Sequence, residues 1–214
     1  MAILYKLTDK DMQTHGGFQW VLGKRSPRLS GAGALCGPGY YHAYLSPATA
    51  VFFNAIHANF RVHEMRLFIA RGIITLNDHD LKVGCRSLVL TEELPVPGMS
   101  DEQPVKFAIL CARRVYYDLE WTKWSAKWLD GIDRSAKAAL EALGIIAADE
   151  ARAGGSFASA AARAASTAAA IPMWPTTGLR AVADAAISAA EARASVRGAP
   201  ALPVVDLAKQ ALGG

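Results

Sequence analysis

Alanine dominates the last third of this 214-residue chain, and this bias limits what that third can fold into. Glycines and prolines divide it, which predicts helices over 149–170, 177–196 and 205–212. Alanine removes little apolar surface from water when it is buried, so each helix alone would be marginally stable. Small residues on one face let two helices approach closely. We therefore expect these helices to pack against the first domain, against one another in a hairpin layer, or against other copies of the chain, with a partly frayed tail as the remaining alternative.

The first half of the chain has a different character, because aromatic and β-branched residues are grouped between turn-forming residues. The pattern predicts strands over 3–7, 18–22, 40–45, 64–70, 81–90 and 105–112. One helix interrupts them, with Ser46 as its N-cap and Pro47 at its first position. We expect an α+β fold: a small mixed or antiparallel sheet with one central helix over residues 1–118, followed by an alanine-rich α-helical region over 119–214.

Three tryptophans lie near the start of the helical region. Trp121, Trp124 and Trp128 are spaced i, i+3 and i+7, which places them on one face of a helix. We expect this face to pack against the first domain rather than to bind a ligand. A second helix should follow and end at Leu143, because Gly144 is a typical C-terminal stop.

Charge and composition exclude several classes of protein. The formal net charge is +4, and the Lys and Arg residues are scattered, which argues against a nucleic-acid surface. No stretch reaches the ~18–20 consecutive apolar residues that span a bilayer, and the N-terminus lacks the pattern of a signal peptide. Three cysteines without a CxxC motif fit a reducing compartment. We expect a soluble protein that is not secreted and has no membrane partner.

The motifs of common catalytic and metal sites are missing from the sequence. In the glycine cluster 31–39, Cys36 stands where the third glycine of GxGxxG belongs, so we interpret the cluster as a flexible surface loop. The five histidines have neither HExxH nor zinc-module spacing, and we expect no metal site. No GxSxG motif is present. Whether the chain is an enzyme stays open on these grounds.

His42 is the single residue with the best context for ligand binding. It lies in an aromatic strand, directly after the glycine cluster and directly before the capped helix. A histidine at a strand end beside a loop is well placed to contact a ligand. The structural alternative is that its ring forms a hydrogen bond with a backbone carbonyl in the core.

Several short segments resemble an uncharacterised family found in bacteriophages and prophages. They are Gly17–Trp20 (GFQW), Gly39–Ala43 (GYYHA) and Asp78–Val83 (DHDLKV). Trp128–Ser135 (WLDGIDRS), which leads into the alanine-rich repeats, resembles the C-terminal extension of some members. The resemblance implies a phage or prophage origin, and hence a place in the host-cell cytoplasm or in the virion. It implies no activity.

A second resemblance is to ADP-ribosyltransferase-like domains, which place a His or Arg on an early strand, a helix after it, and a Glu on a later strand. It implies that His42 would bind the nicotinamide ribose of NAD and that Tyr44 would stack. Glu92 or Glu93 would polarise the ribose hydroxyl.

The expectation from the sequence is a non-enzymatic accessory or structural protein of phage type, without a cofactor. Its first domain would be a binding module, and its alanine-rich helices would form a homo-oligomer or dock on a larger protein assembly. The alternative is an NAD-dependent transferase that uses His42 and Glu92 or Glu93. Nucleic-acid binding through the scattered basic residues ranks last.

Overall fold

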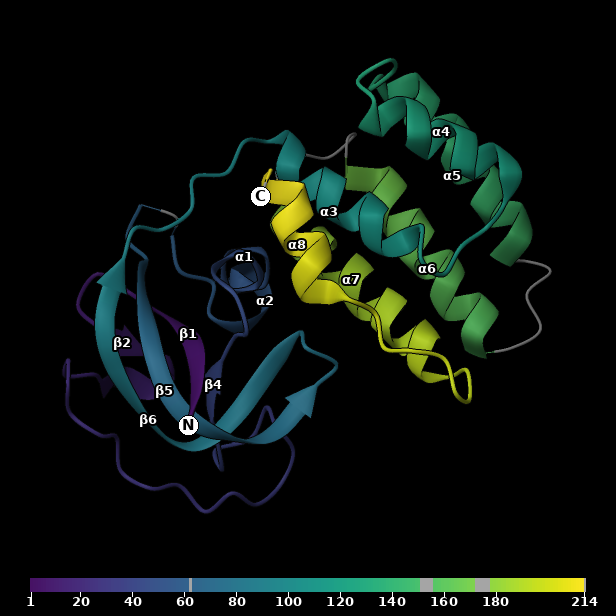
Figure 1. The fold of residues 1–214 in the computed structure, drawn as a ribbon. Coiled ribbons are helices and arrows are strands. Elements are labelled where there is room, and N and C mark those ends of the chain that lie inside the picture. The colour runs from purple at the N-terminus through teal and green to yellow at the C-terminus, as the bar shows by residue number, and fades with distance from the viewer. Residues whose placement is uncertain (62, 151–155, 172–177, 214) are drawn as a thin grey trace. The chain divides into compact units, whose positions relative to one another are not determined.

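The computed structural model describes residues 1–61, 63–150, 156–171 and 178–213 (Figure 1). The chain forms two compact units, Met1–Gly98 and Met99–Gly214. The first contains the strands, a 3-10 helix, η1 (His15–Gly17), and two short α-helices, and the second is helical in its described parts. None of the helices in the described residues is both long and apolar enough to cross a membrane.

The N-terminal unit is built on a four-stranded antiparallel sheet with strand order β1-β5-β6-β4. Its strands are β1 (Ala2–Thr8), β4 (Tyr41–Ala43), β5 (Arg66–Asp78) and β6 (Lys82–Leu94). β5 and β6 form a long hairpin, whose turn contains His79 and Asp80 with positive φ angles of 49° and 62°. The Asn77 side chain holds this turn by accepting from the Asp80 backbone N–H at 2.8 Å.

The sheet curls until its two outer strands meet. Three register shifts along the β5–β6 pairing bend the hairpin, as β-bulges do. As a result Tyr5 of β1 and Tyr44, just beyond β4, exchange two backbone hydrogen bonds of 2.9 and 2.8 Å. The curled sheet encloses a core that includes Leu4, Phe68 and Leu90. A short pair joins β2 (Gln13–Thr14) with β3 (Phe18–Gln19), so the predicted strand 18–22 forms only over Phe18–Gln19.

The central helix begins where the sequence predicts. In α1 (Pro47–Phe52) the Ser46 hydroxyl accepts from the Thr49 N–H at 3.1 Å, and the Thr49 hydroxyl accepts from the Ser46 N–H at 3.2 Å. This reciprocal pair is a capping box, and Pro47 occupies the first helical position. A short helix, α2 (Asn54–His57), follows. The predicted α+β fold with an antiparallel sheet and a central helix is therefore confirmed.

The described part of the C-terminal unit is a helical bundle. Its helices are α3 (Glu102–Ala112), α4 (Leu119–Leu129), α5 (Ala136–Glu150), α6 (Ser156–Ala170), α7 (Gly178–Ala194) and α8 (Val204–Leu212). α3 packs against α6, α7 and α8, and α6 also packs against α5 and α7. The alanines on these faces are buried within the chain, among them Ala164, Ala186 and Ala189. Within the chain these helices pack against one another, as in the hairpin layer considered from the sequence.

Three predictions for this region differ from the structure. Residues 105–112 form most of helix α3 rather than a strand, because the apolar run has buried positions all round and cannot be told from a strand by periodicity. The division between units therefore falls after Gly98, not near Asp118. Gly144 does not end a helix, since α5 continues to Glu150. The predicted helix over 149–170 is described from Ser156 onward, and residues 151–155 lie outside the described residues.

Candidate functional site

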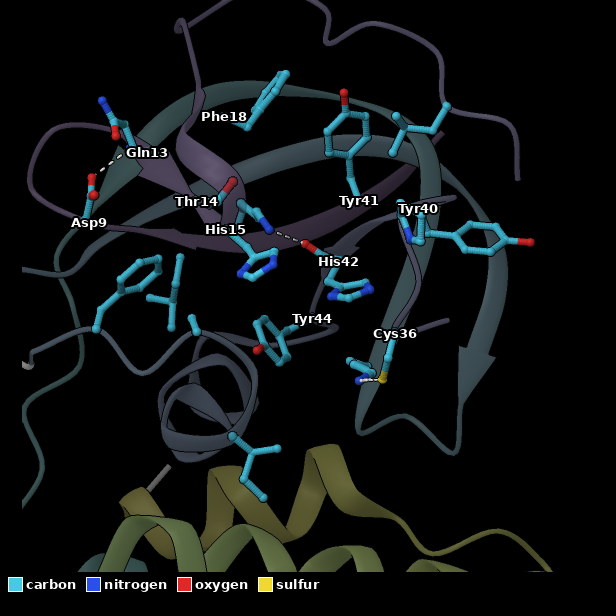
Figure 2. Close-up of a pocket in the computed structure, with 18 of the residues that line it drawn as sticks. Asp9, Gln13, Thr14, His15, Phe18, Cys36, Tyr40, Tyr41, His42 and Tyr44 are labelled. Atoms are coloured by element: carbon cyan, nitrogen blue, oxygen red, sulfur yellow. Dashed lines mark hydrogen bonds between the residues drawn. The ribbon is translucent and has the colours of Figure 1, made fainter. Parts of the chain in front are cut away.

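A pocket of about 900 Å³ opens in the N-terminal unit (Figure 2). Segments far apart in the sequence line it: β1, the turn around β2 and β3, the glycine cluster, β4, the end of α2 and the start of β6. The lining residues with polar or titratable side chains include Lys6, His15, Cys36, His42, Tyr44 and Lys82. A pocket of this size that gathers a few polar groups is typical of small-molecule sites.

The glycine cluster forms one wall of the pocket and is held in place rather than loose. The Gly31 N–H donates to the Gly39 carbonyl at 3.0 Å, and the Tyr40 hydroxyl donates to the Gly31 carbonyl. The wall can lie against the sheet because Gly84, the partner of His42 in the β4–β6 pairing, has no Cβ. A Cβ at Gly84 would collide with Leu35. The cluster is a surface loop, as the sequence predicts, and these contacts tie it to β6 and to its own ends.

His42 is half-buried on the wall formed by β4, and Figure 2 shows its ring directed toward the same space as His15 and Tyr44. Its Nε2 forms a hydrogen bond with the Leu35 carbonyl. Burial is the main cause that lowers the pKa of His42, and this hydrogen bond opposes the shift. The positive charges of Lys6, Lys82 and His15 lower the pKa further. The ring is therefore neutral at pH 7, with its proton on Nε2, since a carbonyl only accepts.

Lys6 brings an ammonium group to the pocket from β1. Its Nζ donates to the His42 carbonyl at 2.7 Å and lies 5.6 Å from the centre of the Trp20 ring. Part of the side chain still reaches solvent, but the surrounding atoms exclude most water from the ammonium. This burial lowers the pKa of Lys6 to about 8. Most copies of the protein still carry this charge at neutral pH.

Lys82 supplies a second ammonium group from the start of β6. The residue is only 3% exposed, and its Nζ lies 2.9 Å from the Cys36 Sγ. Cys36 is exposed on the pocket wall, whereas Cys85 and Cys111 are buried, and all three thiols are free. Burial raises the pKa of Cys85 to about 11. Of these three thiols, Cys36 is the accessible one.

Among the described residues that line the pocket, Asp9 is the only one with a carboxylate. Its Oδ1 accepts from the backbone N–H groups of Asp11 at 3.0 Å and Gln13 at 2.7 Å. These contacts fix the turn between β1 and β2. The carboxylate therefore accepts from the local backbone. The contacts found for Lys6 and Lys82 in the described residues are with the His42 carbonyl and the Cys36 thiol instead.

The structure brings together only some of the predicted site residues. His42 and Tyr44 both line the pocket, and Tyr44 is buried, which raises its pKa. Glu92 and Glu93 do not line it: β6 continues for eight residues from Gly84 to Glu92, roughly 25 Å along the strand. Glu93 instead pairs with Arg66 on the exposed surface, with N–O distances of 2.6 and 2.8 Å. The arrangement of His42, Tyr44 and Glu92 or Glu93 that an NAD transferase would need is not formed.

The tryptophan stripe of α4 is a packing surface. Trp121, Trp124 and Trp128 are 0%, 7% and 3% exposed. Trp121 contacts the Tyr116 ring edge-on at 5.5 Å, and the Arg134 guanidinium lies 4.8 Å from the centre of the Trp128 ring. Arg134 and Tyr116 both belong to the C-terminal unit, although Tyr116 lies within the first domain as it was predicted from the sequence.

Sequence reasoning missed Lys6, Lys82, Cys36 and His15 as pocket residues. A signal was present for Lys6, because residues alternate along a strand and Lys6 shares its face with the core residue Leu4. A lysine on the apolar face of a strand indicates either a charge partner or a cavity. For Cys36 and Lys82 there was no local signal, since 46 residues separate them in the sequence.

No group of three or more His, Cys, Asp or Glu side chains in the described residues could hold a metal ion. The pocket is thus defined by two ammonium groups, a neutral imidazole and aromatic walls. Comparisons of the chain with protein-family models, with curated proteins and with solved structures find no match.

Proposed function

We propose that the chain is a non-enzymatic accessory protein of phage type whose N-terminal unit is a binding module for a small molecule. The observation that supports this most is the convergence of polar side chains from β1, β4, β6 and the glycine cluster on one pocket of about 900 Å³. The Nε2 atom of His42 already forms a hydrogen bond with the Leu35 carbonyl. The pocket is therefore better suited to ligand binding than to acid–base catalysis by this histidine.

The helical unit would attach this binding module to a larger protein assembly or to a second copy. The alanine faces of α6 and α7 are already buried within the chain, so attachment would use the outer surface of the unit. Exposed apolar side chains are available there, including Tyr117, Ile132 and Leu140. Light scattering of the full chain tests self-assembly: a defined multimer supports it, and a monomer at all concentrations removes it.

Thermal unfolding with a panel of charged and neutral small molecules tests the binding module. A ligand at 100 times its Kd stabilises the folded state by about 2.7 kcal/mol, enough for a clear rise in Tm. Ala58→Trp would fill the pocket, because Ala58 lines it, and should abolish the rise. Ala34→Trp is the matched control, since Ala34 is exposed and lies outside the pocket lining. A rise that persists in Ala58→Trp would place binding elsewhere.

A further inference from the structure

The Lys82 ammonium lies in the wall of the pocket without an anionic partner among the described residues. The residue is 3% exposed, and the contact found for its Nζ is the Cys36 Sγ at 2.9 Å. An ammonium group removed from water loses much of its hydration, and proteins usually compensate with a carboxylate or several good acceptors. A single thiol supplies only a weak acceptor. The charge of Lys82 is therefore under-compensated.

The surroundings add to the positive potential at this place. Lys6 contributes a second ammonium, which is bonded to a backbone carbonyl rather than to a carboxylate. Both lysines line the pocket, and both charges lower the pKa of His42. Asp9, the carboxylate of the lining, is held by the backbone of its own turn. Positive charges that converge in a cavity with low-dielectric walls attract anions.

Aromatic side chains line other parts of the pocket. Phe18, Tyr40, Tyr41 and Phe60 all line the pocket, and Figure 2 shows the rings of Phe18 and Tyr41 beside each other. Their centroids are 5.2 Å apart. Aromatic rings favour stacking or edge contacts with planar groups. The pocket thus offers a cationic end at Lys82 and aromatic walls elsewhere.

We infer that the pocket binds a small organic anion with a planar body, either a phosphate monoester or a carboxylic acid of an aryl or nucleoside group. Its acidic group lies beside Lys82 and the exposed thiol of Cys36. The inference rests on the proposed function, because it specifies the ligand class of the same pocket. Lys82 would supply the missing charge pair, and the aromatic walls would contact the planar body.

Cys36 provides a direct probe of this site through alkylation by iodoacetate, an anion, and iodoacetamide, its neutral counterpart. In both reactions the Cys36 sulfur forms a bond to the CH₂ carbon, the C–I bond breaks, iodide leaves and the thiol proton passes to the buffer. The ratio of the two rates cancels the fraction of thiolate, so it reports the local preference for an anion. Mass spectrometry of peptides separates Cys36 from the buried Cys85 and Cys111.

We expect the iodoacetate to iodoacetamide ratio at Cys36 to exceed that of N-acetylcysteine amide by about five-fold or more, because an ammonium lies within contact distance. Lys82→Met should return the ratio to the reference value. Lys24→Met is the matched control, since Lys24 is exposed and outside the pocket, and it should leave the ratio unchanged. A wild-type ratio equal to the reference, or one unchanged in Lys82→Met, would overturn the inference. Lys82→Met removes a buried charge, so we expect it to fold, with a Tm at or above that of wild type.

Protection of Cys36 from iodoacetamide separates this inference from the proposed function. Adenosine monophosphate, phenyl phosphate and benzoate should slow the reaction, whereas adenosine and phenol should do so at least ten-fold more weakly. Protection by the phosphates alone or by benzoate alone identifies the acidic group. Equal protection by the neutral compounds would overturn the anion preference and keep the binding module. No protection by any of the five would count against both.

Discussion

In the N-terminal unit the interior is filled by large side chains such as Phe68, Leu88 and Leu90, whereas in the C-terminal unit the buried positions of α6 and α7 are mostly alanine. A curled sheet encloses a space that only large side chains fill. Helices that pack through alanine faces lie close together, so almost no space remains between them. The first core should therefore be sensitive to lost volume and the second to added volume. A pocket lined by Lys6 and by the buried Lys82 opens in the first unit.

Removal of volume from the sheet core should have the largest effect. Phe68 is 1% exposed and lies in the core cluster, so Phe68→Ala should lower the free energy of unfolding by about 3–5 kcal/mol, through lost apolar burial and a residual cavity. Urea unfolding of the full chain measures the loss, and hydrogen exchange shows whether it is confined to residues 1–98. Ile73→Ala on the same strand is the control, since Ile73 is 72% exposed and its loss should cost less than about 1 kcal/mol. Equal effects of the two substitutions would contradict the proposed core.

Addition of volume should break the alanine core. Ala186 on α7 is 0% exposed, and α7 packs closely on α6 and α3. Ala186→Leu should therefore destabilise the C-terminal unit by about 1–3 kcal/mol, because the helices must separate or the side chain must adopt a strained rotamer. Ala194→Leu at the exposed end of α7 is the matched control and should be nearly neutral. A stabilising effect of Ala186→Leu would show that the helices are less closely packed than the structure indicates.

Lys6, which is partly shielded from water in the pocket of the first unit, should make the stability of that unit depend on pH. The pKa of Lys6 falls from 10.5 to about 8 on folding. Between these values the unfolded chain holds the proton that the folded chain has lost, so this residue makes stability rise with pH. Lys6→Met removes the effect, and the difference in unfolding free energy between variant and wild type should change by about 1–2 kcal/mol from pH 7 to 10.5, in favour of wild type. Groups that titrate equally in both proteins cancel. Parallel pH profiles of the two proteins would show that the Lys6 ammonium is well hydrated.

Sequence signals within one helical turn predicted some elements well. They failed where packing against another element determines whether a segment becomes a helix or a strand. The start of α1 was predictable because the Ser46 cap and Pro47 act within one helical turn. Helix α3 was missed because an apolar run such as Val105–Ala112 suits a buried strand or a buried helix. The signals that do mark its start are weaker: the Gln103 side chain accepts from the Ser100 N–H at 2.8 Å, and Pro104 lies in the first turn, where proline is tolerated.

The candidate site shows the same limit. His42 was recognised from its neighbours in the sequence, and the hydrogen bond to a backbone carbonyl that was its structural alternative is present at Leu35. The contact between Lys82 and Cys36 depends on how the glycine cluster lies against β6, which no local pattern encodes. Glu92 and Glu93 were placed in the site by chain order alone. The β4–β6 register puts them far along the strand from His42.

The smallest expected effect compares one exposed ion pair in each unit. Arg66 holds both carboxylate oxygens of Glu93, at 2.8 and 2.6 Å, whereas Arg163 meets a single oxygen of Glu191 at 3.3 Å. The hydrogen bond from Arg66 lowers the pKa of Glu93, so its contribution to stability is present above the unfolded pKa near 4.5 and is lost as pH falls through the lower, folded value.

Because the pair is exposed, Glu93→Gln should cost at most about 1 kcal/mol at pH 7 and less in high salt. Glu191→Gln should cost nothing measurable, since a single long contact between exposed side chains offsets little of the entropy lost in forming it. Urea unfolding of both variants at pH 3 and pH 7 measures these losses of unfolding free energy. A larger loss in Glu191→Gln than in Glu93→Gln would show that the stronger ion pair is Arg163–Glu191, not Arg66–Glu93.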